Sequence, residues 1–159
     1  EHTNTSNDMK QNREDIPFEY AHCFATDGQC PQRSGCLHAL ITELPMKTSQ
    51  YASNIITAID PRYIASLHGK GSCTFYRSSD LKRYACGMSR MFDAVRSRIV
   101  SEVRRCVQNC FTCRSYYFAS RKGKRLISPA EQAEIASVFR ALCPELRPIY
   151  DSFEERYEW

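Results

Sequence analysis

The feature that most constrains the fold is a run of 35 residues, 88–122, that contains neither glycine nor proline and is bracketed by Gly87 and Gly123. Apolar residues and cysteines recur through it at steps of three or four, which places them on one stripe of a helix. The members of this stripe are Met88, Phe92, Val95, Ile99, Val103, Cys106, Cys110, Cys113 and Tyr117. The pattern predicts one long amphipathic helix over about residues 88–117, around which the rest of the chain is organised.

Shorter helical patterns precede and follow this stretch, and they make the expected fold class all-α. Asp60-Pro61 is typical of an N-cap followed by the first helical residue. Ser128-Pro129-Ala130-Glu131 matches a capping box, which predicts a helix that Pro144 ends. We expect a flexible polar tail over 1–20, a single helical domain over 21–150, and an acidic, aromatic tail or short helix over 151–159.

Nine cysteines are spread along the 159 residues, which favours disulfide bonds formed in an oxidising compartment. They are Cys23, Cys30, Cys36, Cys73, Cys86, Cys106, Cys110, Cys113 and Cys143. Because nine is odd, one is expected to be unpaired or to link two chains in a homodimer. The expected fold is therefore a disulfide-stapled helical domain.

A chain that begins at Glu1 is expected to be a mature secreted product, and Asn4-Thr5-Ser6 is a glycosylation sequon, so Asn4 is the expected glycosylation site.

Metal or cluster binding is the alternative use of these cysteines. Cys106-x3-Cys110-x2-Cys113 resembles the motif by which radical SAM enzymes hold an iron–sulfur cluster. However, Thr112 stands where that family has an aromatic residue, and the motif lies late in a helical pattern. His22-Cys23 is the single adjacent Cys/His pair, without a second pair at zinc-finger spacing. We therefore expect no metal and no cofactor.

Charge is distributed unevenly along the chain and indicates an anionic partner. Residues 77–125 hold 13 basic and 3 acidic side chains, a net charge of +10, whereas 126–159 carry a net charge of −4. The predicted contact residues are Arg90, Arg96, Arg98, Arg104, Arg105, Arg121, Lys122, Lys124 and Arg125. Tyr116, Tyr117 and Phe118 beside them fit the composition of interfaces. Neutralisation by the acidic C-terminal segment is the competing explanation.

These patterns predict a secreted, extracellular binding protein rather than an enzyme. The sequence has no G-x-S-x-G nucleophile elbow and no catalytic-cysteine context, so no catalytic residue is assigned. The expected partner is an extracellular protein or a sulfated glycan such as heparin, and not a nucleic acid. No apolar run approaches the ~20 residues that a transmembrane helix needs. A carrier of an apolar ligand between helices and a small secreted hydrolase are the alternative functions.

Overall fold

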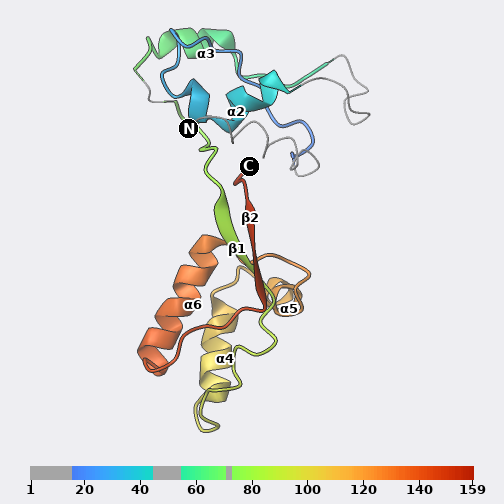
Figure 1. Ribbon diagram of the computed structural model, residues 1–159, viewed down its shortest axis with the longest axis vertical. Helices are drawn as coiled ribbons and strands as arrows, with labels where there is room; N and C mark the ends of the chain where they lie inside the picture. The colour runs from blue at the N-terminus through green and yellow to red at the C-terminus, as the bar shows by residue number, and fades with distance from the viewer. Residues whose placement is uncertain (1–15, 45–54, 71–72) are drawn as a thin grey trace. The chain divides into compact units, whose positions relative to one another are not determined.

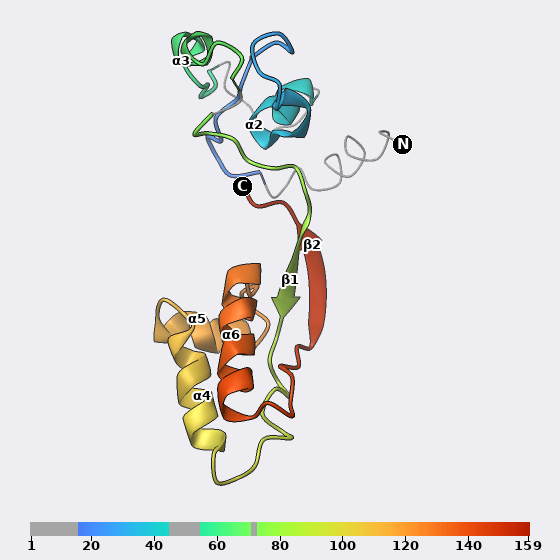
Figure 2. The same ribbon diagram turned by 90° about the vertical axis from the view of Figure 1, so that its left-hand side faces the viewer.

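A computed structural model describes residues 16–44, 55–70 and 73–159, and the chain divides into two compact units. Unit 1 comprises Glu1–Leu81 with Tyr157–Trp159, and unit 2 comprises Lys82–Arg156. Figure 1 shows the elements of each unit, and Figure 2 shows them turned by 90°. None of the helices formed by the described residues combines the length and apolar character needed to span a bilayer.

Unit 2 contains an antiparallel pair of strands, so the all-α prediction is wrong and the fold is mixed α/β. Strand β1 (Lys82–Cys86) pairs with β2 (Ser152–Arg156), in a register that sets Ala85 opposite Phe153. We expected a tail or a short helix where β2 lies. Neither strand shows a clean alternation of buried and exposed residues. Their pairing is set by a long-range contact that local periodicity does not reveal.

Three helices lie beside these strands and enclose the larger core. They are α4 (Val100–Asn109), α5 (Arg114–Arg121) and α6 (Pro129–Leu142), and α6 lies alongside α4 in both ribbon views. The buried cluster of unit 2 consists of Ala85, Met88, Met91, Phe92, Val95, Val103, Val107, Phe111, Tyr117, Ile127, Ile135, Phe139 and Cys143. The periodic stripe thus located much of the core correctly, although not as one helix.

The single long helix predicted over 88–117 is wrong, because residues 88–99 form successive turns. Their backbone hydrogen bonds span three residues, as in Asp93 N–H to Arg90 O at 3.2 Å and Ile99 N–H to Arg96 O at 3.0 Å. Turns also bury apolar residues spaced three or four apart. The Asp151 carboxylate fixes the start of the segment, since it accepts hydrogen bonds from the Ser89 N–H at 3.1 Å and the Ser89 hydroxyl at 2.7 Å.

A second interruption separates α4 from α5. Cys113 is extended, with φ −149° and ψ 160°, and serves as the N-cap residue of α5.

The capping box predicted at Ser128 is confirmed: Ser128 Oγ accepts from the Glu131 N–H at 3.2 Å, and the Glu131 carboxylate accepts from the Ser128 N–H at 2.9 Å. This reciprocal pair, with Pro129 at the first helical position, fixes where α6 begins.

The described residues of unit 1 have little regular structure. Their helical segments are η2 (Arg33–Gly35), α2 (Leu37–Leu40), η3 (Ile41–Glu43) and α3 (Pro61–Ser66). The predicted Asp60 cap of α3 is confirmed, because its carboxylate accepts from the Arg62 N–H at 2.8 Å. One buried cluster gathers Cys23, Ala25, Cys36, Ala39, Ile59 and Ile64. A second contains Leu37, Ile41 and Tyr157.

The disulfide-stapled fold is also wrong, since all nine cysteines are free thiols. Four belong to unit 1 and five to unit 2, so the spread along the sequence reflects two separate sets. On α4, the Cys110 thiol donates instead to the backbone carbonyl of Cys106 at 3.4 Å. Without disulfides, the inferences of secretion, heparin binding and a glycoprotein lose their support. Asn4 itself lies outside the described residues.

Candidate functional site

The nine cations predicted to bind a partner all lie in unit 2, and three of them form ion pairs. Arg90 lies 3.7 Å from Asp93, and Arg96 lies 3.5 Å from Glu145. Arg125 approaches Glu131 to 2.9 Å. The first two pairs are exposed, and exposed pairs contribute little to stability, about 0–1 kcal/mol. Internal neutralisation therefore accounts for part of the predicted basic surface but not for all of it.

On α4 the cations point away from the core. Val103 and Val107 are completely buried one helical turn apart, which leaves Arg104 and Arg105 exposed. The Arg104 guanidinium lies 5.2 Å from the centre of the Phe92 ring, so its position is set by packing as well as by charge. Arg98 precedes α4 and is also exposed.

Helix α5 combines cations with exposed aromatic rings. Tyr117 and Ser120 lie three residues apart and are buried, and this leaves the rings of Tyr116 (45% exposed) and Phe118 (38% exposed) at the surface. The Arg114 guanidinium lies 5.5 Å from the Phe118 ring centre, and that of Arg125 lies 4.6 Å from the Tyr116 ring centre. We define the α5 surface by these contacts and the following lysines, as Arg114, Tyr116, Phe118, Lys122, Lys124 and Arg125.

The basic turn after α5 is a Schellman C-cap. The Gly123 N–H donates to the Ser120 carbonyl at 3.1 Å, and the Lys124 N–H donates to the Ala119 carbonyl at 2.9 Å. Gly123 has φ +71°, the left-handed conformation that this motif requires and that glycine adopts without strain. The motif leaves Lys122 and Lys124 exposed on either side of the glycine, whereas Arg121 is half-buried.

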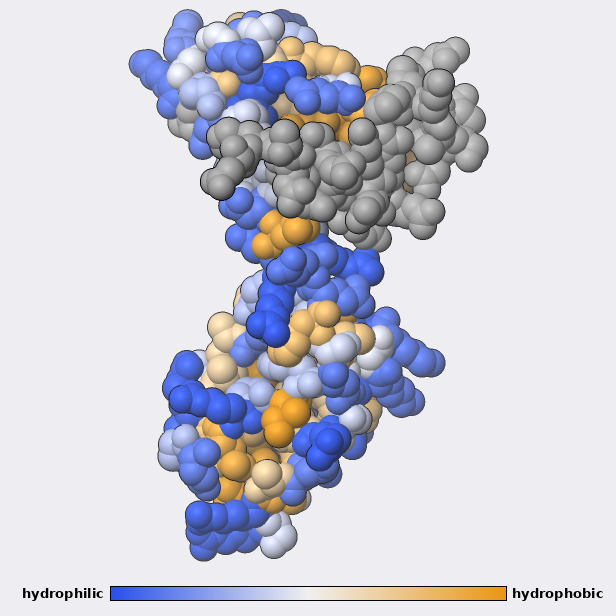
Figure 3. All heavy atoms as spheres, in the orientation of Figure 1, coloured by the Kyte–Doolittle hydropathy of each residue, from blue (hydrophilic) through white to orange (hydrophobic). Residues whose placement is uncertain are grey.

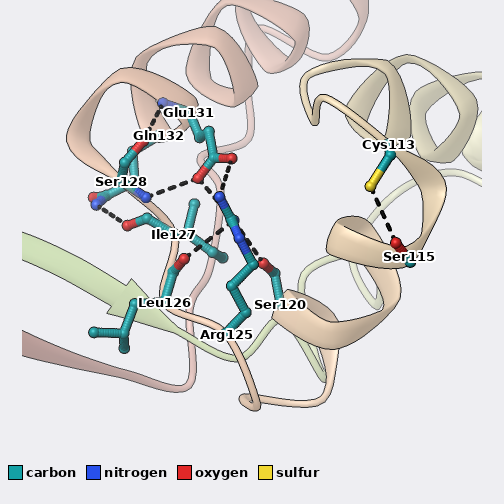
Figure 4. Close-up of polar contacts among 9 residues, drawn as sticks. All are labelled: Cys113, Ser115, Ser120, Arg125, Leu126, Ile127, Ser128, Glu131 and Gln132. Carbon is teal, nitrogen blue, oxygen red and sulfur yellow. Dashed lines mark hydrogen bonds and ion pairs between the residues drawn. The ribbon is translucent and has the colours of Figure 1, made fainter. Parts of the chain in front are cut away.

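Arg125 connects α5 to the start of α6 (Figure 4). Its guanidinium donates to both oxygens of the Glu131 carboxylate, at 3.1 and 2.9 Å, and to Ser120 Oγ at 3.2 Å. Because Glu131 also caps α6 through Ser128, one carboxylate satisfies a cation and a helix terminus together. Of the predicted cations, Arg125 thus supports the fold most directly, while its ring contact positions Tyr116.

Cys113 lies next to this surface, and its thiol is exposed. Cys113 Sγ and Ser115 Oγ lie 3.0 Å apart, and Figure 4 shows the two side chains pointing toward one another. The Ser115 hydroxyl, the backbone amides of Tyr116 and Ser115, and the charge of Arg125 lower the pKa of the Cys113 thiol. Sequence reasoning treated Cys113 as a buried disulfide staple, because the helical stripe passed through it.

In unit 1, four thiols line one small cavity. Cys23, Cys30, Cys36 and Cys73 contribute to its wall together with Arg33 and Tyr76. Cys23 and Cys36 are buried, whereas Cys30 and Cys73 are half-buried. Among the described residues, no group of three or more His, Cys, Asp or Glu side chains is placed so that it could hold a metal ion. Local spacing did not reveal this grouping, since Cys73 is distant in sequence from the other three.

Taken together, the chain is a small mixed α/β protein with a cation–aromatic surface in one unit and a group of thiols in the other. The chain belongs to the family of unknown function DUF6078, whose model matches residues 5–159. No curated protein and no solved structure matches it.

Proposed function

We propose that this protein is a binding protein whose α5 surface contacts an acidic face of another protein. The observation that carries the proposal is the pair of exposed rings, Tyr116 and Phe118, each with an arginine over it. Aromatic residues and arginine are enriched at the centres of protein interfaces, where rigid rings bury a large area at a low entropic cost. The two rings flank the buried Tyr117 on α5, and each is held by its own arginine, so the helix offers two cation–aromatic contact points rather than one continuous patch.

Charge supports an acidic partner. Lys122 and Lys124 are exposed beside the rings, and Arg114 lies over Phe118. The surrounding segment, residues 77–125, carries a net charge of +10. Figure 3 shows small hydrophobic areas among hydrophilic residues on one face of unit 2. The exposed rings beside these cations favour a protein partner, because aromatic residues and arginine are enriched at protein interfaces.

A small-molecule carrier is less well supported. The described cavity in unit 1 offers about 20 Å³ to a water-sized occupant. Sites for small organic ligands are typically about 300–1,000 Å³.

The proposal can be tested by fluorescence anisotropy with labelled polyglutamate as the probe and full-length protein as the titrant. K122E/K124E should weaken binding at least ~10-fold, within the 10–10³ range by which electrostatic steering changes association. R140E/R147E is the matched control, because it makes the same change in net charge at two other exposed arginines of unit 2. Y116A/F118A should also weaken binding without any change in net charge.

Two results would refute the proposed function. Equal losses in both charge-reversed variants would show that net charge alone attracts the probe. Tighter binding of oligouridylate than of polyglutamate would identify a nucleic-acid surface instead, because bases stack on exposed aromatic rings. Binding should also weaken as salt is raised, since exposed charges are screened within about 10 Å at 0.1 M salt.

A further inference from the structure

The described residues of unit 1 contain little apolar packing. The cluster around Cys23 contains two cysteines, two alanines and two isoleucines, and the longest helix in this described part, α3, has six residues. Among the described residues of unit 1, Leu37 is the one large side chain less than 2% exposed. Small units with such cores usually depend on disulfides or a metal ion. Since the thiols are free, disulfides do not supply that stabilisation.

Four of those thiols surround a single cavity. Cys23, Cys30 and Cys36 come from one loop that leads into α2, and Cys73 comes from the segment after α3. The remaining wall is mostly apolar and includes Ala25, Ala39, Ile59 and Phe75, with the side chain of Arg33. The free volume, about 20 Å³, accommodates one water-sized occupant. The cavity therefore fits a single ion rather than a cluster of several iron atoms.

Backbone hydrogen bonds hold the three cysteines of the loop in place. The Cys23 N–H donates to the His38 carbonyl at 2.8 Å, and the Cys30 N–H donates to the Thr26 carbonyl at 3.0 Å. The Cys36 N–H donates to the Arg33 carbonyl at 3.2 Å. The Arg33 Nε donates to the Ala25 carbonyl at 2.8 Å, and this hydrogen bond links two distant parts of the same loop. These contacts order the backbone of the loop before any ion binds, and they leave the cysteine side chains to change rotamer.

We propose that unit 1 binds one Zn²⁺ ion through the sulfurs of Cys23, Cys30, Cys36 and Cys73. Four thiolates in a tetrahedron are a preferred ligand set of structural zinc. On binding, each thiol loses its proton to solvent and forms one Zn–S bond, and no group is oxidised or reduced. Because the described side chains do not stand at metal-ligand geometry, the proposal requires the half-buried Cys30 and Cys73 to turn toward the buried Cys23 and Cys36. This site is independent of the α5 surface.

Native mass spectrometry of the full chain, purified under reducing conditions and titrated with zinc alone, tests the assignment. One Zn²⁺ per chain is expected. C30S and C73S should each lower the affinity by more than the ~10–100-fold that losing a hydrogen-bond partner of a metal ligand costs. C113S is the matched control, because it removes an exposed thiol of unit 2, and its affinity should equal that of the unchanged protein.

A second measurement keeps the test decisive if a variant fails to fold. Alkylation of the unchanged protein, followed residue by residue, should show that zinc protects these four cysteines and leaves Cys113 reactive. Substitution with Co²⁺ should give the charge-transfer absorption of a thiolate site. Failure to retain zinc with all thiols reduced would overturn the proposal. So would disulfides among the four cysteines, protection of a different set, or a coloured iron centre in the purified protein.

Discussion

The capping and ion-pair network at Glu131 offers a sharp test of the structure of unit 2. The Glu131 carboxylate accepts from the Ser128 N–H at 2.9 Å and from the Arg125 guanidinium at 3.1 and 2.9 Å. The two charged side chains are only partly exposed, 13% for Glu131 and 31% for Arg125. Substituting Glu131 by alanine removes both functions, whereas glutamine retains an oxygen for the cap and removes the charge.

The expected cost of Glu131→Ala is about 3 kcal/mol. Loss of a helix cap costs about 1 kcal/mol. Pairs fully in water contribute about 0–1 kcal/mol and breaking a buried pair costs about 3–5 kcal/mol, so this partly exposed pair should contribute about 2 kcal/mol. Glu131→Gln should therefore cost about 2 kcal/mol, because glutamine preserves the cap. Ser128→Ala should cost about 1 kcal/mol, because it removes the other half of the capping box.

Urea denaturation followed by far-ultraviolet circular dichroism is the suitable assay, because α4, α5 and α6 hold most of the described helix. With a urea slope of about 1.5 kcal/mol/M, Glu131→Ala should lower the midpoint by about 2 M. A cost below about 1 kcal/mol for alanine would refute the reasoning, since the network would then behave as an ordinary surface pair. Equal costs for alanine and glutamine would show that the Glu131 side chain contributes nothing to the cap.

Two further substitutions and a titration test other contacts. Gly87→Ala should destabilise the protein by more than about 1–2 kcal/mol in the same assay, because Gly87 has φ +75° and an added Cβ would overlap the Asp151 carboxylate. Gly28→Ala is its control, since an added Cβ there meets nothing within 4 Å; equal costs would refute the argument. Among the described residues, Tyr150 Oη is buried without a hydrogen-bond partner, so Tyr150→Phe should leave stability unchanged or raise it by up to about 1 kcal/mol. Burial raises the pKa of Tyr150 to about 12, so this tyrosine does not change stability with pH below pH ~10, and its ionisation in the unfolded chain lowers the stability of the protein between about pH 10 and 12. A spectrophotometric titration in which Tyr150→Phe removes no late-ionising tyrosine would contradict this.

Local signals in the sequence predicted local structure well. The Ser128 capping box and the Asp60 cap are both present, since each depends on a few neighbouring residues. Hydrophobic periodicity predicted burial of Met88, Phe92 and Val95 correctly, but the helix that it predicted over them is wrong, because turns satisfy the same spacing. The strands were missed for a related reason, namely that residues 82–86 and 152–156 pair across a long separation in sequence.

The candidate surface was partly visible in the sequence. The run of cations and the Tyr116–Phe118 aromatics marked α5 and its turn, because charge and composition are local properties. The roles of individual cations were not visible. Arg125 and Glu131 are six residues apart, which is not a contact spacing within a helix. Their side chains are in contact because the turn that ends α5 leads directly into the N-terminus of α6. Such a contact depends on the turn geometry, which the sequence pattern did not specify.

The cysteines show how one composition supports two opposite physical interpretations. Nine spread cysteines favoured disulfides because they were counted along one chain as a single set. Divided by unit, they become four around a cavity and five in a well-packed helical unit, so an odd total no longer implies an unpaired or intermolecular cysteine. The unit with the weaker apolar core holds the grouped thiols, and the unit with the larger core holds the scattered ones. This is the distribution expected if the sulfurs of unit 1 stabilise it as ligands and those of unit 2 serve mainly as small apolar side chains.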